Sequence, residues 1–121
     1  MRPERWRWFR SCFADARPGA FSDADIEHYV EAWSQPGAAT AMINYYRALP
    51  RRANAPIPPI TAPTRVIWGE RDSVIGAELA EPDRADVPNL ERVIRLPNAS
   101  HWVQHDEPER VAELLTEFFA T

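Results

Sequence analysis

The strongest constraint on the fold of this chain comes from two apolar segments. Each is followed by a turn that carries a titratable side chain. Residues 64–68 (TRVIW) have the composition of a strand and break into a turn that ends at Asp72, while residues 90–96 form a second candidate strand that leads to His101. A short helix is predicted between them, over residues 76–86. In an open α/β sheet, ligands and catalytic groups collect at the carboxyl ends of the strands. The sequence therefore predicts an α/β fold in which Asp72 lies beside His101.

Helices are predicted before the first strand. The spacing of apolar residues predicts helices over residues 4–14, 22–33 and 38–49, the last of them stopped by Pro50. Ser22 and Asp25 form a capping box at the start of the second helix, and Phe21 can pack on Ile26 as a hydrophobic staple.

A proline-rich segment over residues 50–63 separates the predicted helices from the predicted strands. Its prolines exclude a regular helix or a central strand. We therefore place a domain boundary there, with a helical segment over residues 1–54 and an α/β part over residues 55–121. The second strand alternates apolar and charged residues, and the final helix starts at Asp106 or Glu107 with Pro108 in its first turn. Its apolar stripe, from Val111 to Phe119, is expected to cover a face of the sheet.

Composition excludes several classes of function. The net charge of −4 gives no basic patch for nucleic acid, and no apolar run approaches the roughly 20 residues of a membrane span. Cys12 is the single cysteine, which suits a reducing compartment, and the N-terminus does not resemble a signal peptide. No Cys/His cluster has the spacing of a metal site, and four glycines do not make a phosphate-binding loop. We expect a cytoplasmic protein with no metal, no cofactor, no nucleic acid and no membrane partner.

Two motifs resemble the C-terminal end of the α/β-hydrolase fold, namely PTRVIWGERD and LPNASHWVQHDEPERVAELLTEFF. The upstream stretch AFSDADIEHYVEAWSQPGAATAMINYYRAL is similar to the helical cap of epoxide hydrolases and their haloacetate dehalogenase relatives. The resemblance implies that Asp72, rather than Glu70, is the acid that orients His101 as general base. It also implies that Tyr46, in an N-x-Y-R segment, donates a hydrogen bond to the epoxide oxygen.

Each of these residues also has a purely structural alternative. His101 could simply pack in a loop beside Trp102, Asp72 could bond the backbone of its own turn, and Tyr46 could be a core aromatic. Trp102 is expected to line a substrate pocket. The remaining candidates are assigned to packing (Trp68 and Trp33) or to the surface (His28 and His105).

The nucleophile of such an enzyme sits on a G-x-D-x-G or G-x-S-x-G elbow, and its oxyanion hole on a His-Gly-x-Pro loop. Neither segment occurs in these 121 residues. The resemblance thus implies the C-terminal part of a hydrolase that opens a small apolar substrate such as an epoxide through a covalent ester, with no turnover by this chain alone. A dehalogenase, a serine esterase and a non-catalytic partner-binding chain remain alternatives. Two strands leave an unpaired sheet edge, so we expect self-association or pairing with a missing N-terminal half.

Overall fold

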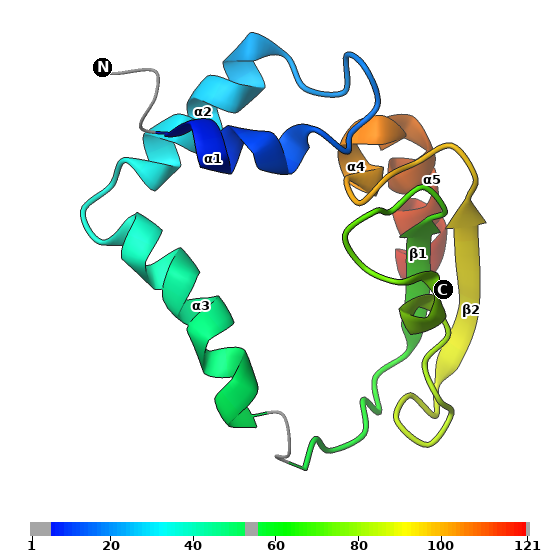
Figure 1. Ribbon diagram of the computed structural model, residues 1–121. Helices are drawn as coiled ribbons and strands as arrows, with labels where there is room; N and C mark the ends of the chain where they lie inside the picture. Colours follow the sequence, from blue (N-terminus) through cyan, green and yellow to red (C-terminus); the bar gives the residue numbers. More distant parts are fainter. Residues whose placement is uncertain (1–5, 53–55, 121) are drawn as a thin grey trace.

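The computed structural model describes residues 6–52 and 56–120, with the backbone alone at residue 52. Helices come first and strands later, as Figure 1 shows. In chain order the elements are α1 (Arg7–Arg10), the 3-10 helix η2 (Ser11–Phe13), α2 (Asp23–Trp33), α3 (Ala38–Arg52), β1 (Thr64–Gly69), the 3-10 helix η3 (Ala77–Ala80), β2 (Leu90–Leu96), α4 (Val103–Asp106) and α5 (Pro108–Phe119).

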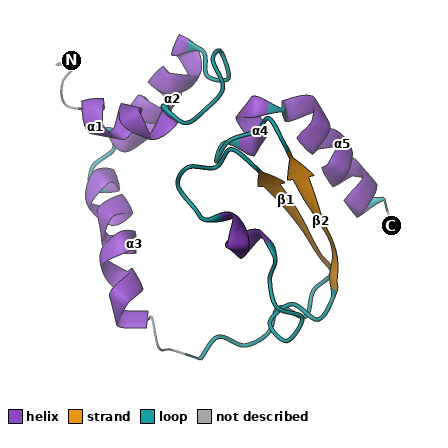
Figure 2. Ribbon diagram, turned by 45° about the vertical axis from the view of Figure 1, so that its right-hand side comes forward, coloured by secondary structure: helices purple, strands orange, loops and turns teal. Residues whose placement is uncertain are grey.

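The two strands pair in parallel, as the sequence predicts. Gly69 at the end of β1 lies opposite Leu96 at the end of β2, so both strands deliver their following loops to the same edge. Within the described ranges the sheet has two strands, and β1 is half-buried along most of its length rather than fully buried. Helix α5 runs beside both strands, with α3 on the opposite side of the molecule (Figure 2). Val111 of α5 packs in one cluster with Leu96 and Ala99, so the predicted apolar stripe of this helix covers the sheet at its start. Leu115 and Phe119 of the same stripe are exposed, so the prediction holds for only part of it.

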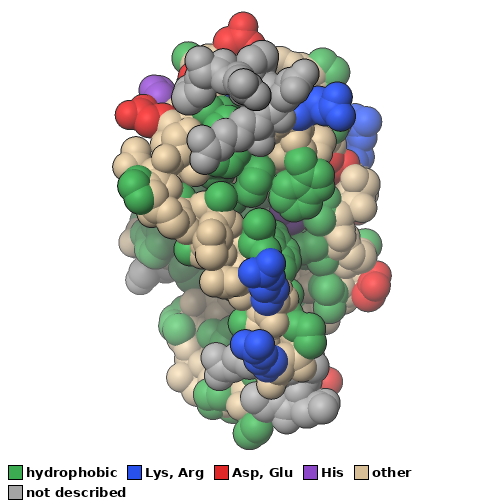
Figure 3. All heavy atoms as spheres, turned by 60° about the vertical axis from the view of Figure 1, so that its left-hand side comes forward, with side chains coloured by type: hydrophobic (Ala, Val, Ile, Leu, Met, Phe, Trp, Pro, Cys, Tyr) green, Lys and Arg blue, Asp and Glu red, His purple; other side chains and the backbone are tan. Residues whose placement is uncertain are grey.

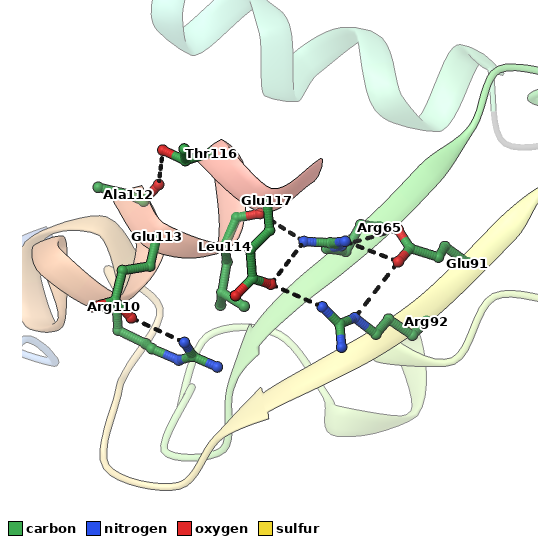
Figure 4. A network of polar contacts seen from close by, with 9 residues as sticks. All are labelled: Arg65, Glu91, Arg92, Arg110, Ala112, Glu113, Leu114, Thr116 and Glu117. Atoms are coloured by element: carbon green, nitrogen blue, oxygen red, sulfur yellow. Dashed lines mark hydrogen bonds and ion pairs between the residues drawn. The ribbon is translucent and has the colours of Figure 1, made fainter. Parts of the chain in front are cut away.

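A charged network fastens β1, β2 and α5 together (Figure 4). The Arg65 side chain is only 6% exposed and lies between Glu91 of β2, at 2.8 Å, and Glu117 of α5, at 3.6 Å. It also donates a hydrogen bond to the Leu114 carbonyl at 2.6 Å, and its guanidinium lies over the Phe118 ring. A bidentate guanidinium with several acceptors holds a fixed geometry that a flexible ammonium does not. Arg65 therefore fixes the register of α5 on the strands.

Helix α2 begins where the capping box predicts. The Ser22 hydroxyl accepts from the Asp25 N–H, and the Asp25 carboxylate accepts from the Ser22 N–H at 2.8 Å. The helix contributes Val30 and Trp33 to an aromatic cluster with Phe13, and Phe21 and Ile26 border the same cluster. The prediction that Trp33 packs the helical segment is confirmed.

Three details of the predicted helices were wrong. Helix α3 continues through Pro50 to Arg52. The proline removes one backbone hydrogen bond and crowds the carbonyl four residues earlier, but its ring holds φ near the helical value and only two helical residues follow it. The helix expected over residues 76–86 is only η3, because Pro82 keeps the preceding Glu81 out of the helical region, at φ −108° and ψ 81°. The first helix is the short pair α1 and η2, ending at Phe13, and residues 4 and 5 of that prediction lie outside the described ranges.

The chain forms an open ring in which the helical segment meets the α/β part at one end only (Figure 1). The loop between η2 and α2 reaches α4 and the ends of the strands, whereas α3 stands away from the sheet. Hydrophobic side chains gather on the face that α1 and α3 present (Figure 3). The exposed members are Trp8, Met42, Ile43, Tyr45, Tyr46 and Leu49. None of the helices in the described ranges is long and apolar enough to cross a membrane.

Candidate active site

Asp72 is held by its own turn and by the histidine at the same time. One carboxylate oxygen accepts from the backbone N–H groups of Val74 and Ile75, at 2.8 and 2.9 Å, and the other lies 2.9 Å from Nδ1 of His101. Its side chain is 7% exposed, whereas Glu70 is exposed. Burial would raise the pKa of Asp72, but the hydrogen bonds from His101, Ile75 and Val74 outweigh it and lower the pKa below its ordinary value. The structure thus brings Asp72, and not Glu70, to the histidine.

The ionised state of Asp72 fixes the chemistry of the His101 ring. A carboxylate only accepts hydrogen bonds, so the ring atom beside it, Nδ1, must carry a proton. The lone pair of the neutral ring is then on Nε2, where it can take a proton from water or from a substrate. The His101 side chain is 32% exposed, so it is accessible from the adjoining cavity. An oriented imidazole beside a buried carboxylate is the arrangement of a general base.

Backbone contacts at Gly69 bring the two loops together. The Arg71 N–H donates to the Ala99 carbonyl at 2.9 Å, and the Glu70 N–H donates to Leu96 at 3.0 Å. A Cβ atom on Gly69 would lie 2.1 Å from the Ser100 carbonyl oxygen and 2.6 Å from that of Ala99. Only glycine allows this close approach of one backbone to another.

Gly69→Ala is expected to lower the free energy of unfolding by about 1–3 kcal/mol, because backbone atoms must move to admit the methyl group. Urea denaturation would measure the change. Gly76→Ala is a matched control, since a Cβ there meets only the flexible Glu78 side chain and Gly76 has a φ of −65°. Equal effects of the two substitutions would contradict the role given to Gly69.

Asp106 supports the histidine loop from inside the molecule. This buried carboxylate accepts from the Ser100 N–H at 2.6 Å and from the Arg17 N–H at 2.8 Å, and its own carbonyl accepts from the Arg17 guanidinium. Burial would raise the pKa of Asp106, but the hydrogen bonds from Ser100 and Arg17 lower it below the ordinary value. The residue before His101 is thereby tied to the helical segment.

Stability is expected to fall as the pH drops below about 4. The pKa values of Asp72 and Asp106 are lowered in the folded chain, so the unfolded chain, with carboxyl pKa values near about 3.9, binds protons first. The stabilisation is fully present above that pH and is lost as the pH falls through the folded pKa values. Urea midpoints measured from pH 6 to pH 3 would show how steeply stability depends on pH. Asp106→Asn should make stability depend less steeply on pH. An unchanged dependence would contradict the contribution assigned to the Asp106 carboxylate.

A cavity of about 320 Å³ brings three sequence-predicted residues together. His101, Trp102 and Tyr46 all line it, and a second cavity of about 490 Å³ shares Tyr46 with it. Tyr46 is 68% exposed, so the alternative of a core aromatic is wrong. The Trp102 indole N–H donates to the Cys12 carbonyl at 2.9 Å, which fixes the ring at the cavity wall. The remaining walls of the smaller cavity are largely apolar, made by Phe9, Cys12, Phe13, Tyr29, Trp33, Met42 and Val74.

Several features of this site escape sequence reasoning. His105, predicted at the surface, is half-buried: it stacks on Phe21 and shares a hydrogen bond with the Tyr29 hydroxyl at 3.2 Å. Its polar sequence neighbours suggested exposure, but α4, which was not predicted, turns it toward α2. His28 is exposed as expected, and Trp68 is half-buried. No group of three His, Cys, Asp or Glu side chains is placed to hold a metal within the described ranges.

Comparisons with known proteins identify the family. The model of the "Alpha/beta hydrolase family" matches residues 1–114. A Bacillus subtilis AB hydrolase superfamily protein is 42% identical over 103 residues, which cover 84% of this chain and 36% of that protein. Human epoxide hydrolase 4 is 39% identical over 98 residues, covering 78% of this chain and 26% of that protein.

Solved structures agree with the sequence matches. A laboratory-evolved variant of potato epoxide hydrolase superimposes with a TM-score of 0.70 at 31% identity, over 84% of this chain and 35% of that one. The chain belongs to the α/β hydrolase family, within which it is similar to epoxide hydrolases, and it has the structure of the C-terminal part of that fold. It spans about a quarter to a third of the length of these relatives.

Proposed function

We propose that the Asp72–His101 pair and Tyr46 form the acid–base half of an epoxide hydrolase site. The observation that carries the proposal is the 2.9 Å contact between Asp72 and Nδ1 of His101, beside a largely apolar cavity that Tyr46 also lines. The similarity to epoxide hydrolases supports it. The substrate class that suits such walls is a small apolar epoxide.

The reaction would take two steps. A carboxylate nucleophile, supplied by the part of the family fold that this chain does not span, attacks an epoxide carbon to form an ester. The ring C–O bond breaks, and the Tyr46 hydroxyl stabilises the developing alkoxide by hydrogen bonding and protonation. Water then attacks the ester carbonyl and gives a proton to Nε2 of His101, while Asp72 stabilises the resulting imidazolium. The tetrahedral species then collapses, and the departing alkoxide takes the proton from His101, which gives the diol. The proton left on the nucleophile's carboxyl returns through solvent to the Tyr46 phenolate, so the carboxylate, His101 and Tyr46 are all restored.

A chimera tests this proposal. Residues 6–120 would replace the matching segment of potato epoxide hydrolase, and diol formation from styrene oxide would be followed by chromatography. We expect turnover by the folded chimera and none by the 121-residue chain alone, because the chain contains no nucleophile elbow. Diol formation by the chain alone, or a folded chimera that is inert toward epoxides, would contradict the proposal. Release of halide from a haloacetate would instead indicate a dehalogenase.

A further inference from the structure

Asp15 links the helical segment to both loops of the acid–histidine pair. It lies just after η2, and one carboxylate oxygen accepts a short hydrogen bond from the Ser73 hydroxyl. The other oxygen accepts from the backbone N–H of His101 at 3.1 Å. Ser73 is the neighbour of Asp72 in sequence, so one carboxylate spans the gap between the acid loop and the histidine loop.

The neighbouring bonds make this link rigid. Asp72 is fixed in its turn by Val74 and Ile75, and Ser100 is held by Asp106. Backbone contacts beside Gly69 already join the bases of the two loops. Asp15 adds a second link further along, between the Ser73 hydroxyl and the His101 backbone N–H. In a family site, a displacement of about 1 Å between catalytic groups is costly, so such a bridge would matter for reactivity.

The charge of Asp15 is consistent with this position. Burial and the nearby Asp72 carboxylate each raise the pKa of Asp15, but the hydrogen bonds from Ser73 and His101 outweigh them and lower it. Asp15 therefore stays ionised near neutral pH and keeps both acceptor oxygens available. A neutral, protonated carboxyl would lose part of that capacity.

We propose that Asp15 is a positioning residue that sets the geometry of the Asp72–His101 hydrogen bond by bonding Ser73 and the His101 backbone. Its importance for hydrolysis rests on the proposed function. The positioning itself can be measured on the 121-residue chain without substrate or nucleophile.

The test is the proton NMR signal of the His101 Nδ1–H group, recorded at low temperature on chain with ¹⁵N-labelled histidine. Asp72→Ala should abolish this signal and so assign it. Asp15→Ala should broaden it beyond detection, because both bonds of the bridge are lost. Asp15→Asn should retain it, because the amide oxygen can still accept from the His101 N–H while the amide N–H₂ donates to the Ser73 hydroxyl. Asp83→Ala is the matched control, since Asp83 is exposed and, in the described part of the chain, its side chain accepts only from the Ala85 N–H.

Three results would overturn the inference: no such signal in the unsubstituted chain, an unchanged signal in Asp15→Ala, or equal loss in Asp15→Asn and Asp15→Ala. Amide spectra would verify that each variant folds. If Asp15→Ala does not fold, Ser73→Ala carries the test, because it removes one bond of the bridge and should broaden the same signal. An Asp15-dependent signal in a chimera without epoxide turnover would reject the proposed function while supporting the positioning role.

Discussion

Asp106→Ala is expected to lower the free energy of unfolding by about 2–3 kcal/mol at pH 7. Asp106 is 8% exposed, and its carboxylate accepts from two backbone N–H groups, those of Ser100 and Arg17. Its loss leaves the buried Ser100 donor without a partner, which costs roughly 1–3 kcal/mol. The Arg17 donor belongs to an exposed residue and can turn to water, so it adds less. Urea denaturation followed by tryptophan fluorescence would measure the change.

The matched variants separate the role of this carboxylate from general effects of removing charge. Asp106→Asn keeps one acceptor and should fall between the wild-type chain and Asp106→Ala. Asp83→Ala removes an exposed aspartate that also accepts one backbone hydrogen bond, and it should change the unfolding midpoint little. An Asp106→Ala chain as stable as Asp83→Ala would contradict the structure around Ser100.

His101→Gln is expected to reduce steady-state diol formation by the chimera by about 10³-fold or more, in line with the loss of a general base. Attack of the nucleophile on the epoxide does not require His101, so the ester should accumulate. Intact-mass spectrometry would then show a protein heavier by the mass of one substrate. Asp72→Asn should produce the same species, because an asparagine favours the wrong ring tautomer.

Tyr46→Phe should slow the first step of the proposed reaction, the opening of the epoxide. Without the phenol, opening of the epoxide slows and the ester should not accumulate, even in combination with His101→Gln. Tyr45→Phe is the matched control, because Tyr45 is exposed to a similar degree but is not among the residues that line the two cavities described above. Equal effects of the two tyrosine substitutions would contradict the assignment of Tyr46 to the reacting oxygen.

Local signals were enough to predict the strands, the start of α2 and the start of α5. Ser22 and Asp25 lie within one helical turn, and Pro108 occupies the first turn of α5, so no distant contact is needed to interpret them. The Asp72–His101 pair was predictable because both strands are parallel and end at one edge. Choosing these two residues also depended on their resemblance to the α/β-hydrolase motifs, since many loops contain an aspartate or a histidine.

Distant contacts account for what the sequence did not predict. Asp106 looked like the start of the last helix, yet its carboxylate turns back to Ser100 and across to Arg17, which is 89 positions away. Asp15 has no local pattern at all, because Ser73 and His101 come from other loops. A carboxylate next to neither a strand end nor a helix start carries no sequence signal for such a bridge.

Because the chain forms a ring, the contact between its helical and α/β parts depends on the linker that joins them. The helical and α/β parts meet in one region around His101, through hydrogen bonds and through the rings of Phe13 and Phe21, which contact Trp102 and His105. Elsewhere they are joined by the exposed residues 56–63. Because both parts lie on one polypeptide, those bonds form at the high effective concentration of tethered partners, on the order of millimolar for short linkers. A single proteolytic cut between residues 56 and 60 would turn the same contact into an encounter between two molecules. The contact would then weaken on dilution. An exposed linker that touches neither loop would thus help to decide whether Asp15 reaches His101.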